Sequence, residues 1–438
     1  MVACGPSLAE KDPLSPLETT LDIDVETAAV ATVRWSTDEP ADAVVEYGAD
    51  DAYGGSVAGW SSTDGLDHAV VLAGLAGGRE WHWRASSEGD DGTRVSGDEI
   101  FVPASPPAAL PDLVVQGEQE GLVLATLLGD GASIAVYDSD GQAVWWRILE
   151  QDHAFSNQAR LTTDARAVVY LGSGFGEGDP DAYLIRVPIV GGEETRLNVG
   201  FAHHDFVMRG DGAYTLIRAD KREVDGVVVQ GDEIVEFDAD GSMRVVWSTW
   251  DDVPLPSDVS LLSTIDGHVA DWTHVNGLAW DGTRYWVSSY SMGALYVIDG
   301  ATGELEWQLG GDLSDFELAE GEGFGPQHSP ELVDGGVLLF NNRSPEVGGL
   351  WSEAAEFAID TATHTYSRRW TFDDGQGVFT AAFGSVERLG DGDTFVGWGS
   401  AGRLSRVTAA GEVPWQADTP IGTAFGFVHH VATLCGTP

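Results

Sequence analysis

The chain has 438 residues, of which 71 are acidic and 22 basic, so its formal net charge is -49. A surface this negative repels phosphate backbones and anionic lipid headgroups, and we therefore expect no nucleic-acid partner and no electrostatic adhesion to membranes. With 43% hydrophobic residues and 16 tryptophans, the chain has ample apolar material for a core and is not expected to be disordered. Such a surface stays soluble when salt screens its charges, which is compatible with a marine or salt-tolerant source. Arginines greatly outnumber lysines, and a biased genomic base composition would explain this excess equally well.

The distribution of glycine and of apolar runs indicates an all-β protein. There are 56 glycines, and Gly/Asp pairs recur between short apolar runs, which is the turn chemistry of many short strands. No long segment repeats apolar residues with a helical period, and no apolar run reaches the roughly 18 residues of a membrane span.

Residues 1–14 are interpreted as an N-terminal tether, and the two cysteines, Cys4 and Cys435, lie near the ends of the chain. Small residues directly before Cys4 resemble the end of a bacterial lipoprotein signal, which predicts a lipidated Cys4 and anchoring at the outer membrane. A disulfide between Cys4 and Cys435 would instead tie the ends together, and two reduced thiols are the third interpretation. Either of the first two implies an extracytoplasmic protein that is periplasmic, at the cell surface or secreted.

Residues 15–105 contain about seven short segments of alternating apolar and polar residues, the pattern of an immunoglobulin-like β-sandwich. Within them, residues 32–40 and 45–48 resemble the fibronectin type III-like modules that precede secreted enzymes, with Trp81 in place of the usual corner tyrosine. The proline-rich segment 103–108 is stiff and poor in hydrogen-bond donors, which favours a domain boundary there. The predicted strands lie at residues 20–25, 31–36, 43–47, 68–72, 80–84 and 99–102.

Residues 110–438 repeat one motif, in which an apolar run ends in an acidic turn and is followed by glycine and then tryptophan. Each copy is typical of the outer hairpin of a four-stranded sheet, with the tryptophan as a structural residue between sheets. Six copies, one of them degenerate, give about 55 residues per unit, which predicts a six-bladed β-propeller. The tryptophans of the copies are Trp145 with Trp146, Trp247, Trp307, Trp370 and Trp415, and the degenerate copy lies near residues 183–186.

Histidines gather where the innermost strand of each blade is expected, roughly 30–40 positions before each tryptophan. Imidazoles that converge on a central channel can act as nucleophiles, transfer protons or bind a metal, and hydrogen bonding to inner-strand backbone is the alternative for any one of them. Asp205 follows His204 directly and is expected on the opposite strand face, which disfavours a metal site, although three histidines from different blades would suffice for zinc or copper. Eight of the 11 histidines lie in or beside such positions: His153, His203, His204, His268, His274, His328, His429 and His430.

Three separated segments resemble the arylsulfotransferase (aryl-sulfate sulfotransferase) family of propellers, and they agree with it in order and spacing. The resemblance covers about residues 110–438 and implies a six-bladed propeller with an N-terminal β-sandwich. The segments are residues 271–276 with 287–289 and 303–311, residues 203–205 with Gly212, and residues 327–328 with 337–342 and 356–360.

The family transfers sulfuryl groups from aryl sulfates to phenols without a nucleotide donor, so the resemblance implies these small molecules as substrates and no cofactor. It places the histidine nucleophile, which forms a transient sulfohistidine, at His328. It places the groups that bind the sulfuryl oxygens and handle the phenol proton at His204, His274 and Asn276. The physical logic is that a neutral imidazole attacking sulfur splits one difficult displacement into two easier ones.

Four further residues, His203, Tyr290, Asn342 and Arg343, are expected to bind substrate. After residues 288–289 the family usually has an arginine that faces the sulfuryl group, but this chain has Tyr290. One lost charge-assisted hydrogen bond costs about 1.5–3 kcal/mol, and Arg343 or Arg218 is a candidate substitute. The departure favours an alternative function, a non-catalytic, surface-anchored propeller that binds a small aromatic or carbohydrate ligand in its central channel.

Other chemistries have weak support in the sequence. No Gly-x-Ser-x-Gly elbow is present, and the glycine-rich stretch 172–176 does not lead from a strand into a helix as a phosphate-binding loop does. Asp-rich turns such as residues 138–141 offer oxygens to calcium, but they recur as turn residues and are interpreted as such. We therefore expect no metal.

Overall fold

The computed structural model describes residues 19–23, 29–129, 132–149, 155–174, 179–210, 212–265, 269–320, 322–343, 351–420 and 422–434. Nearly all regular structure in these ranges is β-strand, which confirms the all-β class. The helices are short: α1 (Thr249–Asp252) and the 3-10 turns η2 (Val259–Leu261) and η4 (Gly399–Ala401). Within the described ranges no helix is long and apolar enough to cross a membrane.

The chain divides into two compact units between Ser105 and Pro106, inside the proline-rich segment. The first unit contains two antiparallel sheets, whose apolar faces share one core that includes Val33, Val70 and Trp83. The indole nitrogen of Trp81 donates a hydrogen bond of 3.0 Å to the Ala76 carbonyl, a bond of the kind that a corner tyrosine makes to backbone upstream. The sheets are β1 (Thr19–Ile23), β2 (Ala31–Ser36), β6 (Asp67–Leu72) and β5 (Trp60–Ser61), and β4 (Gly55–Ala58), β3 (Val44–Gly48), β7 (Trp81–Gly89) and β8 (Gly92–Val95), with β9 (Glu99–Phe101) also on β7.

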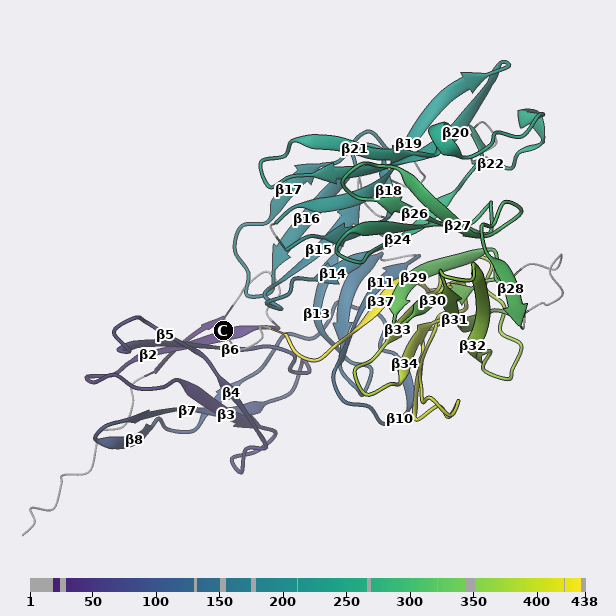
Figure 1. The fold of residues 1–438 in the computed structure, drawn as a ribbon. Helices are drawn as coiled ribbons and strands as arrows, with labels where there is room; N and C mark the ends of the chain where they lie inside the picture. Colours follow the sequence, from purple (N-terminus) through teal and green to yellow (C-terminus); the bar gives the residue numbers. More distant parts are fainter. Residues whose placement is uncertain are drawn as a thin grey trace, which may run out of the picture. The chain divides into compact units, whose positions relative to one another are not determined.

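The second unit contains six sheets of four or more strands (Figure 1). Three of them carry the residues of the candidate site. These are β18 (Ala202–Met208), β19 (Tyr214–Val224), β20 (Val227–Phe237) and β21 (Met243–Ser248), with β23 (Val269–Asp271) and β22 (Thr264–Ile265) beside β20; β24 (Val275–Trp280), β25 (Arg284–Ser289), β26 (Ala294–Asp299) and β27 (Leu305–Gly310); and β29 (Gln327–Val333), β30 (Gly336–Asn341), β31 (Glu353–Asp360), β32 (Thr365–Phe372) and β28 (Glu317–Glu320).

The other three sheets complete the unit and join its two ends. The last strand of the chain pairs with β11, and the strand that follows the linker, β10, pairs with β36. The sheets are β13 (Ala143–Ile148), β12 (Ser133–Tyr137), β11 (Leu122–Leu128) and β37 (Ala424–Val431); β14 (Ala159–Leu161), β15 (Ala167–Gly172), β16 (Tyr183–Pro188) and β17 (Thr195–Asn198); and β33 (Ser385–Arg388), β34 (Thr394–Gly397), β35 (Arg403–Val407), β36 (Trp415–Asp418) and β10 (Val114–Gly117).

The innermost strands of the six sheets contact one another in a closed circuit. Strand β18 contacts β24, β24 contacts β29, β29 contacts β33, β33 contacts β37 and β37 contacts β14, while β15 returns to β18. Sheets arranged around a common axis in this way are the architecture of a β-propeller. Residues at corresponding heights of these strands therefore face one channel.

Tryptophans of the repeat lie on strands toward the outer side of each sheet, and two of them contact the neighbouring sheet. Trp247 on β21 packs against Tyr296 of the next sheet, with ring centroids 5.5 Å apart. Trp415 on β36 is fully buried and donates to the Ser139 carbonyl in the turn between β12 and β13. These contacts agree with a structural role for the tryptophans.

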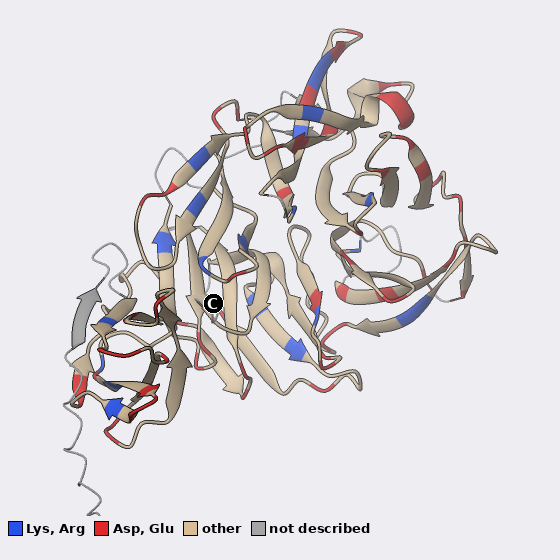
Figure 2. Ribbon diagram, turned by 60° about the vertical axis from the view of Figure 1, so that its left-hand side comes forward, with Lys and Arg blue, Asp and Glu red and all other residues tan. Residues whose placement is uncertain are grey.

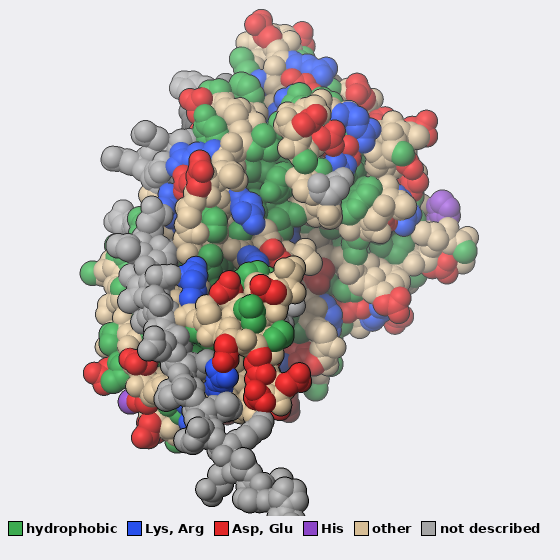
Figure 3. Space-filling model, turned by 90° about the vertical axis from the view of Figure 1, so that its left-hand side faces the viewer, with side chains coloured by type: hydrophobic (Ala, Val, Ile, Leu, Met, Phe, Trp, Pro, Cys, Tyr) green, Lys and Arg blue, Asp and Glu red, His purple; other side chains and the backbone are tan. Residues whose placement is uncertain are grey.

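Acidic residues are distributed over many turns and strand ends rather than gathered in one segment (Figure 2). On the face drawn in Figure 3, Asp and Glu alternate with arginine and with apolar or neutral side chains. Many arginines pair with these carboxylates; Arg403, for example, contacts both Asp374 and Asp418. The large negative charge is thus a property of the surface as a whole.

Candidate functional site

Five aromatic side chains from three neighbouring sheets form a continuous series of ring contacts. His203 and His204 lie on β18, His274 immediately precedes β24, Tyr290 follows β25, and His328 lies on β29. Successive ring centroids are 5.1 Å apart for His203 and His204, 5.0 Å for His204 and His274, 5.4 Å for His274 and Tyr290, and 5.4 Å for Tyr290 and His328. The structure therefore brings together five of the eight residues expected at the site, and we call these five the ring cluster.

Irregular backbone at the start of each inner strand turns the histidines into this position. His204 and His274 adopt left-handed φ values of 58° and 44°. The pairing register shifts between His203 and Phe206, between Val275 and Gly277, and after His328. Bulges of this kind redirect side chains and are over-represented beside active sites.

Gly277 allows two of these strands to approach each other closely. A Cβ atom at this position would lie 2.5 Å from Cδ of Pro330, on the strand that carries His328. Any larger residue at 277 would push β24 and β29 apart and separate the imidazoles that they carry.

The hydrogen bonds of Asn342 fix the tautomer of His328. The Asn342 amide nitrogen donates to the carbonyls of Thr380 and Phe383, at 2.9 and 2.8 Å, so its Oδ1 must be the atom that faces the imidazole. His328 Nδ1 lies 2.7 Å from this Oδ1 and must carry the proton, because the amide oxygen can only accept. The lone pair of neutral His328 is therefore on Nε2.

Carboxylates orient the other histidines. Asp271 accepts a short hydrogen bond from His274 Nδ1, which leaves Nε2 as the nitrogen that exchanges protons within the site. His203 Nε2 lies 3.2 Å from Asp232 Oδ1, and its Nδ1 lies 2.8 Å from His204 Nδ1. One of the two facing Nδ1 atoms donates to the other, and when His203 is the donor, the proton of neutral His204 lies on Nε2.

Burial keeps two of the imidazoles neutral. Desolvation lowers the pKa of His328 to about 3, against the opposing effect of the Asn342 hydrogen bond. Desolvation, together with the neighbouring His274, His203 and His328, also lowers the pKa of His204 well below its ordinary value. Neutral imidazole is the form in which histidine is nucleophilic, so this environment suits nucleophilic chemistry at ordinary pH.

Tyr290 lies between His274 and His328. Its hydroxyl donates to the Ala381 carbonyl at 2.8 Å, and burial raises the pKa of that hydroxyl. Tyr290 also borders a cavity of about 680 Å³, whose lining combines Tyr296, Phe324 and Leu313 with polar side chains such as Gln308 and Asp312. A cavity of this size and lining accommodates an aromatic ring.

Three expected site residues lie outside the ring cluster and are held by hydrogen bonds or ion pairs. Asn276 is fully buried, donates to the Gln327 carbonyl at 2.8 Å and accepts from Ser288, so it supports the strand of His328 rather than joining the ring cluster. Arg343 pairs with Glu353 and Glu322, and Asn342 holds the His328 imidazole. The suggested substitute for the family arginine, Arg218, pairs with Glu233 at 2.6 Å.

The remaining candidates lie outside the ring cluster or outside the described residues. His429 lies further along the channel on β37 and contacts Gln158, while the neighbouring His430 contacts the Glu120 carbonyl. Cys4, Cys435, His153 and His268 lie outside the described residues. Among residues that the structure does describe, no group of three or more His, Cys, Asp or Glu is placed to hold a metal ion.

Sequence reasoning missed the carboxylates that orient the histidines. Asp271 stands three residues before His274 in the very motif that carries the family resemblance, so the signal was available there. Asp232 gave no such signal, because it lies on β20, 29 positions after His203 in the chain, and meets it through the folding of the sheet.

The comparisons with known proteins identify the family. The family model described as arylsulfotransferase (ASST) matches residues 116–421, more than half of the chain. The chain therefore belongs to the arylsulfotransferase family. None of the curated proteins compared with the chain matches it.

Solved structures show only distant likeness. A protein of unknown function from Bacteroides caccae is 13% identical, with 72% of this chain and 100% of that chain covered and a TM-score of 0.46. A streptogramin B lyase is 13% identical, with 71% and 85% covered and a TM-score of 0.37. A hypothetical selenium-binding protein from Sulfolobus tokodaii is 10% identical, with 98% and 97% covered and a TM-score of 0.37. At these values the likenesses carry no argument about function.

Proposed function

We propose that this protein is an extracytoplasmic arylsulfotransferase that moves a sulfuryl group from an aryl sulfate to a phenolic acceptor through a sulfohistidine at His328. Membership of the arylsulfotransferase family supports the substrate class. The observation that carries the mechanism is the Asn342 hydrogen bond, which leaves the lone pair of a buried, neutral His328 on Nε2.

In the first half-reaction, His328 Nε2 attacks sulfur, the N–S bond forms and the bond from sulfur to the aryl oxygen breaks. The aryl oxygen leaves as a phenolate and takes a proton from the imidazolium form of His274, which Asp271 stabilises. The sulfated His328 ring is cationic, and its Nδ1–H bond to Asn342 becomes charge-assisted at that stage.

In the second half-reaction, the acceptor phenol loses its proton to neutral His274 and its oxygen attacks sulfur. The N–S bond breaks, and His328 returns to its neutral form. His204 is 5.0 Å from His274 between ring centroids, and in the tautomer whose Nδ1 accepts from His203 it donates its Nε2 proton to the sulfuryl oxygens as charge develops on them. The aryl group of donor or acceptor fits against the aromatic side chains of the cavity that borders Tyr290.

The test is transfer from a chromogenic aryl sulfate to a phenol by the full chain. We expect phenol release that depends on the acceptor and is lost in His328→Gln, in which the side-chain amide can still donate to Asn342. The matched control is His364→Asn, because His364 is exposed in an outer hairpin at a φ of 53° that asparagine tolerates. Unchanged transfer by His328→Gln would refute the mechanism.

The alternative is a channel that binds a small aromatic or carbohydrate ligand without turnover. The geometry of the arginines favours it, because Arg343 and Arg218 are both paired with carboxylates and Tyr290 replaces the family cation. This function predicts that an aryl sulfate raises the melting temperature of the protein and is recovered intact. Consumption of the donor would exclude it.

A further inference from the structure

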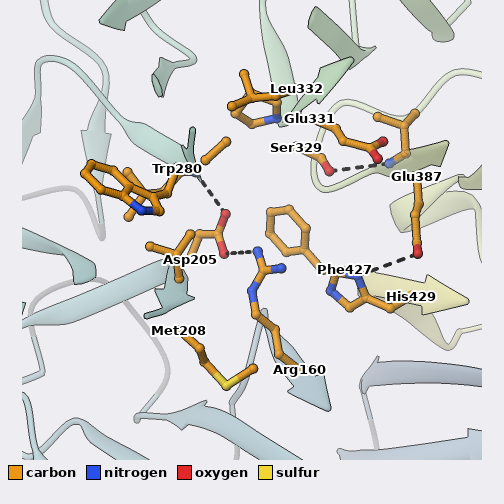
Figure 4. Close-up of a pocket in the computed structure, with 15 residues that line it drawn as sticks. Arg160, Asp205, Met208, Trp280, Ser329, Glu331, Leu332, Glu387, Phe427 and His429 are labelled. Atoms are coloured by element: carbon orange, nitrogen blue, oxygen red, sulfur yellow. Dashed lines mark hydrogen bonds and ion pairs between the residues drawn. The ribbon is translucent and has the colours of Figure 1, made fainter. Parts of the chain in front are cut away.

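A second cavity lies further along the same inner strands and shares no residue with the ring cluster. Its volume is about 470 Å³. Strands β18, β24 and β29 carry ring-cluster histidines at or just before their starts and contribute Asp205, Trp280 and Glu331 to this cavity further along. Figure 4 shows its charged side chains and the ring of Phe427 directed toward a common space.

The charges that line this cavity do not balance. Arg160 is the one arginine among its described lining residues, against the three carboxylates Asp205, Glu331 and Glu387, a formal balance of -2 with His429 neutral. Arg160 is committed to Asp205, at 3.1 Å, and to the Phe206 carbonyl, at 2.8 Å. Asp205 is further satisfied by Gln158 and by the backbone nitrogen of Leu278.

Within the described part of the chain, neither Glu331 nor Glu387 forms an ion pair with an arginine or a lysine. Arg160 and Arg388 act on Glu331, and Arg160 and His430 on Glu387, only as nearby charges. Each uses one oxygen, Oε2, to accept a backbone N–H from the next sheet, at 2.7 Å from Arg388 and 2.8 Å from His430. The guanidinium of Arg388 is directed away, to Glu356. The second oxygen of each carboxylate, Oε1, therefore remains available to a donor inside the cavity.

His429 does not supply the positive charge that Glu331 and Glu387 lack. Gln158 donates its amide N–H to Asp205, so its oxygen faces His429 Nε2 and accepts the imidazole proton there. His429 Nδ1 lies 3.8 Å from Glu387 Oε2, beyond hydrogen-bond distance. Burial, which the charge of Arg160 reinforces, lowers the pKa of His429 to about 3, so the imidazole stays neutral at ordinary pH.

Apolar side chains form about half of the cavity lining. Trp280, Phe427, Met208 and Leu332 enclose the space between the carboxylates. Aromatic faces attract organic cations. A strongly hydrated metal ion makes no favourable contact with apolar side chains, so the lining favours an organic cation over a metal ion. A ligand that satisfies both features has a positive charge and an apolar body.

We propose that this cavity binds a small organic ammonium ion, an amine with an aryl or alkyl body, whose N–H groups bond to Glu331 and Glu387 while the body contacts Trp280 and Phe427. The proposal is independent of sulfuryl transfer, since it uses none of the ring-cluster residues. It assigns to the channel a second ligand site in addition to that of the aryl sulfate.

Binding of such a cation is coupled to proton release. Burial and the neighbouring Glu387 raise the pKa of Glu331 to about 8, and burial raises the pKa of Glu387. An ammonium ion favours the ionised carboxylates, so a proton leaves on binding and affinity increases as pH rises from about 6 to about 8. The other charged and titratable groups near Glu331 and Glu387 are Arg388, Arg160, Asp205, His429 and His430.

Isothermal titration of the full chain with three probes of one shape tests the proposal. We expect 2-phenylethylammonium to bind at least about tenfold more tightly than neutral 2-phenylethanol or anionic phenylacetate, because a charge-assisted hydrogen bond is lost with either of these. Repeating the titration in buffers of different ionisation enthalpy measures the released proton. Equal binding of the alcohol, no saturable binding of the amine, or binding of calcium chloride in its place would overturn the proposal.

Variants locate the site. In the double variant Glu331→Gln with Glu387→Gln, the amide oxygens still accept the two backbone N–H groups, so we expect the fold to persist and amine affinity to fall by at least about tenfold. The matched control is Glu317→Gln on the exposed strand β28, with wild-type affinity expected. Equal amine binding by the double variant and the wild type would overturn the assignment, and wild-type transfer activity in the double variant would show that the two sites are separate.

Discussion

Acidification distinguishes a buried, neutral His328 from an ordinary solvated histidine. Burial lowers the pKa of His328 to about 3 from the ordinary value of 6.5. At about pH 5, a group with a pKa of about 3 is protonated in only about 1% of molecules, whereas a solvated histidine is protonated in about 97%.

The corresponding free energy follows from linkage. The difference between the two pKa values amounts to about 5 kcal/mol, at about 1.4 kcal/mol for each pH unit. Below pH 6.5, His328 takes up a proton in the unfolded chain but not in the folded one. The contribution of His328 to the free energy of unfolding is therefore fully present above pH 6.5 and is lost as the pH falls toward 3. His328 alone is expected to cost the folded state about 2 kcal/mol at about pH 5 relative to about pH 7.5.

Histidine-selective NMR measures this ionisation directly. The His328 ring signals are assigned by their absence from the His328→Gln spectrum, and we expect them to stay in place between about pH 7.5 and about pH 5. Their pattern should also show the proton on Nδ1, as the Asn342 bond requires. Urea unfolding of both proteins over the same range should show the wild type losing about 2 kcal/mol more. A titration midpoint of His328 between about pH 5.5 and 7 would refute the reasoning.

Three further substitutions test other parts of the structure. Asp271→Asn removes the carboxylate partner of His274 and should lower kcat by at least about tenfold with a smaller change in KM. Steady-state kinetics with an aryl sulfate measures both constants, and changes of equal size in kcat and KM would contradict a role in proton transfer. Tyr290→Arg restores the family cation and should tighten aryl sulfate binding by about tenfold or more in a competition assay, and unchanged or weaker binding would oppose that reading. Trp145→Ala empties a fully buried site and should cost about 3–5 kcal/mol in chemical denaturation, whereas Trp60→Ala, at 49% exposure, should cost little; similar effects of the two would contradict the structural role of the repeat tryptophan.

The sequence could predict the β-rich architecture because its signals are local. Turn residues, apolar runs and a tryptophan recur in each copy, and each copy corresponds to a pair of adjacent strands. The ring cluster was also within reach, since histidines at matching positions of inner strands meet whenever those strands surround one channel. Tyr290 was found through the family pattern rather than through any property of its own.

The supporting contacts could not be predicted, because they depend on irregular backbone and on pairs that are distant in the chain. Strict alternation along β18 does not anticipate the register shift after His203 or the left-handed φ of His204. Asn276 and Arg343 have the residue types of anion-binding groups, but only the fold shows that Gln327 and Glu353 occupy them. The cavity beside Glu331 combines residues from six strands and left no motif in the sequence.

The most direct test of the proposed chemistry is the mass of the intact protein after mixing with an aryl sulfate in the absence of acceptor. We predict an increase of about 80 Da, the mass of one sulfuryl group, which peptide mapping places on His328 and which a phenol acceptor removes. A folded protein that releases phenol without this adduct, or that carries it on another residue, would contradict the mechanism.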